Sequence, residues 1–185
     1  MDSTTIILIA GVAAVVIALA VVAFVSWNNR RRERHLQETF GAEYDTTYAS
    51  AVNRKAAVAN LKSREERVSS YEIHPLSEEQ RRAFAAEWQN MQASFVDHPS
   101  TAVNRADLLL AEVMRARGYE TDPGDDTARI EDVSVGHGEQ AAALREAAHI
   151  AKLNREGKAT TEDLRRAIKD YGVVFDALLN EAQPV

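Results

Sequence analysis

The strongest constraint on the fold is an uncharged apolar run close to the start of the sequence. Residues 6–25 read IILIAGVAAVVIALAVVAFV, which is 20 residues without a charged side chain. At about 1.5 Å per residue, a helix of this length reaches roughly 30 Å, the thickness of the hydrocarbon core of a bilayer. A buried helix of a soluble domain normally has a polar face, and this run has none. We therefore expect residues 1–27 to form a transmembrane anchor.

A cleaved signal peptide is the alternative explanation of this run. Small residues at Ala18 and Ala20 have the spacing of a cleavage site. However, signal peptides carry positive charge before the apolar run, and here the leader MDSTT has none. The charge patterning favours a retained anchor.

Positive charge follows the run and predicts its orientation. The flank contains one aromatic residue and four arginines, namely Trp27, Arg30, Arg31, Arg32 and Arg34. Arginines next to a membrane span favour the cytoplasmic side, and Trp favours the membrane–water interface. We expect a bacterial inner-membrane protein with residues 28–185 in the cytoplasm; the alternative places the soluble part on the outer side. The arginines either bind anionic lipid headgroups or only stop the transfer of the chain through the membrane, and the second role requires no specific partner.

A four-residue repeat of small side chains lies within the predicted span. Ala10, Ala14 and Ala18 share one helix face. Such a face allows transmembrane helices to approach closely, so it is either a packing face for self-association or a consequence of the alanine content of the run.

The composition excludes several classes of protein. The chain has 185 residues, no Cys and a net charge of −6. Without Cys there is no disulfide framework, thiolate metal site or thiol nucleophile. An acidic total argues against nucleic acid as the main partner, since phosphate binding requires a basic face.

The rest of the sequence has the period of helices and predicts an all-α protein. Residues 28–70 have a thin apolar stripe, weakened at Gly41, and a charged end, which is typical of a juxtamembrane stalk made of one long helix or two. On this segment Tyr44 and Tyr48 either pack onto the soluble part or form a partner surface, where aromatic residues are enriched. A coiled-coil dimer through this segment is possible, but its seam is poor.

Residues 71–185 are expected to form a small antiparallel bundle of about four helices. Ser77 with Gln80 has the pattern of a capping box, Gly118 that of a helix C-terminus, and Thr160 or Thr161 that of a cap for the last helix. Residues 119–138 are expected to be a loop that contains at most one short helical turn. Three apolar stripes predict the bundle core, and they contain Phe84, Trp88, Met91, Phe95, Leu110, Val113, Leu164, Ile168, Tyr171, Phe175 and Leu178.

We find no motif that predicts catalysis, a cofactor or a metal. The five His residues do not pair at metal-binding spacing, and the acidic run at residues 122–126 lacks the ligand spacing of a calcium loop. There is no G-x-S-x-G elbow and no phosphate-binding loop after a strand. We expect a protein that is not an enzyme.

Three segments resemble an uncharacterised bacterial family. They are HLQETFGAEYD at 35–45, residues 75–119 and EGKATTEDLRRAIKDYGVVFDALL at 156–179. The resemblance implies an N-terminal membrane segment or signal-like leader, a helical C-terminal part and no known activity.

The leading hypothesis is a single-pass membrane-anchored interaction or scaffold protein, an accessory subunit of a larger membrane complex. Its partners are the bilayer and other membrane subunits or a second copy of itself. The alternative is a membrane-tethered helical domain that binds a small ligand or acts as an enzyme, with a pocket between helices. A stalk that only sets spacing is a third possibility.

Overall fold

The computed structural model describes residues 3–122 and 124–181, with side chains described from residue 17 onward except that of Ala18. This part of the chain contains helices and no strands, so the all-α prediction is confirmed. The helices are α1 (Ser3–Phe40), α2 (Ala42–Ser50), α3 (Arg54–Ser69), α4 (Glu78–Ser94), α5 (Pro99–Ala116), α6 (Asp126–Ser134), α7 (Gly138–Arg155) and α8 (Thr161–Asn180).

The chain divides into two compact units, Met1–Glu38 and Thr39–Val185. The predicted boundary between stalk and bundle, at residue 70, therefore differs from the observed one. The juxtamembrane segment, for which one helix or two were predicted, breaks at Gly41, whose φ of +49° is a conformation that favours glycine. Beyond this break α2 packs against α3 and α7, and α3 packs against α6. Residues 42–69 thus belong to the larger unit.

Short polar motifs set where the helices of the larger unit begin. The Ser77 side chain accepts the backbone N–H of Gln80, while the Gln80 side chain accepts that of Ser77. Thr160 and Asp163 form the same reciprocal pair at α8. Both predicted caps are confirmed, with Thr160 rather than Thr161 as the N-cap.

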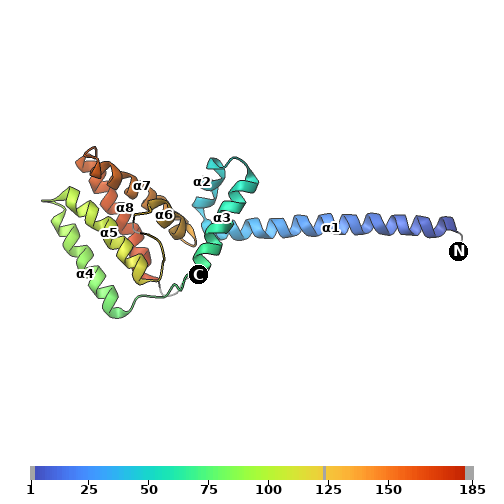
Figure 1. Cartoon of the computed structure of the whole chain (residues 1–185), viewed down its shortest axis with the longest axis horizontal. Helices are drawn as coiled ribbons and strands as arrows, with labels where there is room; N and C mark the ends of the chain where they lie inside the picture. Colours follow the sequence, from blue (N-terminus) through green and yellow to red (C-terminus); the bar gives the residue numbers. More distant parts are fainter. Residues whose placement is uncertain (1–2, 123, 182–185) are drawn as a thin grey trace. The chain divides into compact units, whose positions relative to one another are not determined.

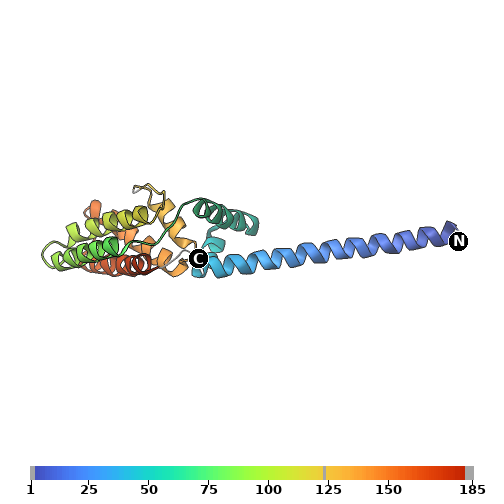
Figure 2. The ribbon, with the colours of Figure 1, turned by 90° about the horizontal axis from the view of Figure 1, so that it is seen from below.

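The core of the larger unit is built around α8, which packs against α4, α5 and α7. Figure 1 shows α4 and α5 as a helical hairpin beside α8, and Figure 2 shows the same three helices alongside one another. Trp88 of α4 stacks on Phe175 of α8 with ring centroids 4.6 Å apart. Of the predicted core residues, Phe84, Phe95 and Ile168 are partly buried against this cluster and the others are buried.

The segment predicted as a loop, residues 119–138, contains the nine-residue helix α6. Asp125 caps this helix by accepting the backbone N–H of Ala128. Val133 is fully buried and Ile130 is partly buried against the core. A short helix can therefore form here despite the acidic sequence, because its apolar side chains and its one arginine, Arg129, are buried.

Candidate functional site

Apolar side chains of α1 in the smaller unit are exposed between residues 17 and 27. Their exposed fractions range from 49% to 65%. At about 100° per residue they are distributed around the whole circumference of the helix. The side chains are Ile17, Leu19, Val21, Val22, Phe24, Val25 and Trp27. An apolar surface on every side of a helix is one that water does not favour, so it needs another environment.

The arginine flank follows directly on the same helix. Arg30, Arg31, Arg32 and Arg34 are exposed. The guanidinium of Arg31 lies 4.5 Å from the centre of the Trp27 ring, within the range of a cation–π interaction. Continuous helix thus joins an apolar segment to a basic one, with Trp27 between them.

Within the described part of the chain, none of the helices combines the length and the apolar character needed to cross a membrane. The predicted packing face of Ala10, Ala14 and Ala18 lies outside the residues whose side chains the structure describes.

Tyr44 and Tyr48 lie next to each other on α2 in the larger unit. Their rings stack with centroids 4.3 Å apart. Tyr44 is only 6% exposed and Tyr48 is half-buried. Of the two alternatives for Tyr44, the structure shows packing within the unit, because α2 lies against α7.

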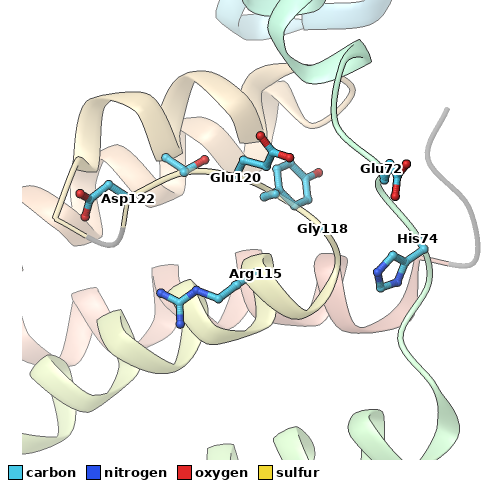
Figure 3. Close-up of a pocket in the computed structure, with 8 residues that line it drawn as sticks. Glu72, His74, Arg115, Gly118, Glu120 and Asp122 are labelled. Carbon is cyan, nitrogen blue, oxygen red and sulfur yellow. The ribbon is translucent and has the colours of Figure 1, made fainter.

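A hollow of about 640 Å³ lies between the segment after α3 and the end of α5. Figure 3 shows Arg115 on α5 and His74 on the facing segment, with Glu120 and Asp122 on the loop that follows Gly118. Tyr119 also lines this hollow, and burial followed by the nearby charge of Glu181 raises the pKa of its hydroxyl to about 12. The phenol therefore stays protonated at neutral pH and is a poor general base. The hollow offers charged groups of both signs.

Buried ion pairs connect the helices of the larger unit, and they were not predicted from the sequence. Asp132 of α6 is fully buried and accepts hydrogen bonds from Arg67 Nε at 2.8 Å, Tyr71 Oη at 3.1 Å and Thr121 Oγ1 at 2.5 Å. Burial and the Asp132 charge raise the pKa of Tyr71. Since Arg67 lies on α3 and Thr121 precedes α6, one carboxylate fastens three separate segments.

A second network surrounds Asp107 of α5. Its Oδ1 accepts from Arg129 at 2.6 Å and from the Tyr171 hydroxyl at 3.0 Å. Burial and then the Asp107 charge raise the pKa of Tyr171. The only signal in the sequence was Arg129, a single base in an acidic segment; its burial explains why it stands there.

A third network lies at the C-terminal end of α8. Arg117 is fully buried, donates to the Leu178 carbonyl oxygen at 2.6 Å and pairs with Glu181 at 2.8 Å. His137 Nε2 lies 3.2 Å from the other oxygen of Glu181. Burial acts to raise the pKa of Glu181, but His137 and Arg117 together hold it below its ordinary value. These contacts have a structural role, since they tie the end of α8 to α5 and α7.

Metal ligation has no candidate in the described residues, where no three His, Asp or Glu side chains are placed to share an ion. His137 and Tyr171 belong to the separate networks of Glu181 and Asp107.

Comparison with known proteins gives no match, whether to a protein-family model, to a curated protein or to a solved structure. The resemblance to an uncharacterised bacterial family therefore stays a prediction.

Proposed function

We propose that this chain is a single-pass membrane-anchored interaction protein, and that it serves as an accessory structural subunit of a larger membrane complex. The observation that carries the proposal is the apolar surface on every side of α1, followed at once by exposed arginines. In this proposal the uncharged run at residues 6–25 lies in the bilayer, and residues 28–185 lie in the cytoplasm.

Simple energetics support a lipid environment for this segment. Fully burying one large apolar side chain is worth about 1.5–3 kcal/mol. The six exposed side chains from Ile17 to Val25 keep half to two-thirds of their surface, so moving them out of water favours insertion by roughly 4–12 kcal/mol. The helix satisfies its own backbone hydrogen bonds, as a bilayer requires.

The flank supports the orientation. Arg30, Arg31, Arg32 and Arg34 would face the cytoplasmic headgroups, where each adds about 1 kcal/mol of attraction to an anionic leaflet. Trp27 would lie at the interface, stacked with Arg31.

The mechanism would be tethering. An anchor confines the helical unit to the membrane plane and raises its effective concentration near membrane partners. The spacing of Ala10, Ala14 and Ala18 supports close packing of the span against another helix, which belongs either to a partner subunit or to a second copy.

Alkaline extraction of membranes tests the anchor. Two arginines at the middle of the run, Val15→Arg with Val16→Arg, should release the protein from the membrane, because an arginine near the centre of a span costs about 2.5–3.5 kcal/mol. The matched control is Val52→Arg with Val96→Arg, since both valines are highly exposed in the larger unit. The proposal fails if the unsubstituted protein is itself extracted, or if the control pair is released equally.

Affinity purification in mild detergent, followed by mass spectrometry, tests the role as a subunit. Stoichiometric membrane proteins that co-purify would support it and identify the complex. A protein that elutes alone and stays monomeric at every concentration would contradict it.

A further inference from the structure

The inner face of α2 is polar where a packed helix normally presents apolar side chains. Glu43, Thr46, Thr47 and Ser50 have the spacing i, i+3, i+4 and i+7, so they lie on one side of the helix. This side lines a hollow of about 420 Å³, whose other walls come from α3, α6 and α7. Glu43 and Thr47 are the buried members of this stripe, whereas Thr46 and Ser50 are exposed. The two buried polar side chains suggest that the hollow holds a polar molecule.

The charges in this hollow balance. Glu43 Oε1 accepts from Arg64 Nη1 at 3.1 Å and from Arg145 Nη2 at 2.7 Å. Arg64 Nη2 also lies 3.4 Å from Glu131 Oε1. Two carboxylates and two guanidinium groups therefore line the hollow, which favours an occupant without net charge.

Several buried polar atoms at this hollow have no hydrogen-bond partner in the described part of the chain. Glu43 is only 2% exposed, yet its Oε2 receives no hydrogen bond. The Thr47 hydroxyl, on a residue 6% exposed, is also unpaired, as is Arg64 Nε. Buried polar groups in folded proteins are nearly always satisfied, so these atoms call for a partner that the chain itself does not supply.

We propose that this hollow binds a small zwitterion, of the class of free α-amino acids. Its ammonium group would donate to Glu43 Oε2 and to the Thr47 hydroxyl. Its carboxylate would accept from Arg145, whose side chain is 42% exposed and uses one Nη for Glu43. Guanidinium groups bind carboxylates well because their N–H groups match the two oxygens.

The competing occupant is an ordered water. A water can bridge Glu43 Oε2 and the Thr47 hydroxyl, but it needs neither a second guanidinium group nor a hollow of this size. Binding of a zwitterion therefore depends on Arg145, whereas binding of a water does not.

Thermal unfolding and calorimetric titration of the full chain in detergent distinguish them. The probes are the twenty amino acids, each at millimolar concentration, with inositol and inorganic phosphate for comparison. We expect at least one amino acid to raise the melting temperature and to bind saturably, since a ligand that binds only the folded state stabilises it.

Two variants and a control locate the site. Thr47→Val keeps the shape and removes only an unpaired hydroxyl, so the protein should stay folded while affinity falls at least tenfold. Arg145→Gln should weaken binding similarly, and Thr101→Val, at an exposed position of α5, should leave it unchanged. The proposal is overturned if no amino acid binds, if inositol or phosphate binds instead, or if both variants bind as tightly as the unsubstituted protein. Each of these results is independent of whether α1 enters a membrane.

Discussion

Gly118, just after α5, has two separate reasons to be glycine. Its φ of +95° lies in the region that other residues rarely adopt, and a Cβ at this position would overlap the backbone carbonyl of Glu72. The neighbouring His74 N–H donates to the Arg117 carbonyl oxygen at 2.9 Å, which keeps the facing segment in place. Gly118→Ala is therefore expected to destabilise the larger unit strongly.

The two contributions can be estimated separately. Placing a non-glycine residue in a left-handed conformation costs about 1–2 kcal/mol. Forcing an extra carbon against backbone that cannot rotate away costs about 1–3 kcal/mol. If both apply, Gly118→Ala lowers the free energy of unfolding by about 2–5 kcal/mol, a large share of the 5–15 kcal/mol of a typical domain.

Two other glycines allow the conformational cost and the steric cost to be measured separately. Gly157 has a φ of +69° and open space around it, so Gly157→Ala carries only the conformational cost. At Gly138, whose φ is not in the left-handed region, a Cβ would overlap the Phe40 carbonyl, so Gly138→Ala carries only the steric cost. Urea unfolding followed by circular dichroism at 222 nm measures all three. The reasoning is refuted if Gly118→Ala and Gly157→Ala are equal within about 0.5 kcal/mol, the usual error of additivity.

Three further predictions follow from the core, the caps and the buried phenols. Phe175→Ala should lower the free energy of unfolding by about 3–5 kcal/mol, because the side chain is only 1% exposed and stacks on Trp88. The control Val173→Ala, at a position 44% exposed, should change it by about 0.5 kcal/mol or less, and urea unfolding followed by Trp fluorescence measures both. Thr160→Ala should cost about 1 kcal/mol by removing the cap of α8, and in the same assay an equal loss in Thr161→Ala would contradict the assigned cap. The pKa of Tyr119 rises from 10.0 to about 12 on folding, so the folded protein holds this proton more tightly than the unfolded chain. The resulting contribution to the free energy of unfolding is complete below pH 10 and is lost as the pH rises to about 12, so between these values the stability of Tyr119→Phe should depend less on pH.

The helices that the sequence predicted well are those whose signals are local. The Ser77 and Thr160 boxes depend on residues three positions apart, and the stripe containing Trp88 and Met91 repeats within one helix. Such patterns hold whatever surrounds them, because the partners are on the same helix.

The sequence was less informative where a segment depends on distant partners. The apolar stripe of α2 and α3 was too thin to predict packing, and their contacts with α7 and α6 include the pairs of Glu43 with Arg145 and of Arg67 with Asp132. These pairs join residues 102 and 65 positions apart, so no local pattern reveals them. The hollow beside α2 could not be predicted either, because its walls come from segments far apart in the sequence. The i, i+3, i+4, i+7 spacing of the polar residues on α2 was nevertheless visible in the sequence.

The position of α8 at the centre of the core has a consequence for the synthesis of the chain. Helices α4 and α5 leave the ribosome first, with the side chains that will cover α8 still exposed to water. At roughly 5–20 residues per second, the 64 residues from Arg117 to Asn180 take roughly 3–13 s to translate. During that interval the hairpin of α4 and α5 lacks the helix that completes its core, so its folding waits for α8.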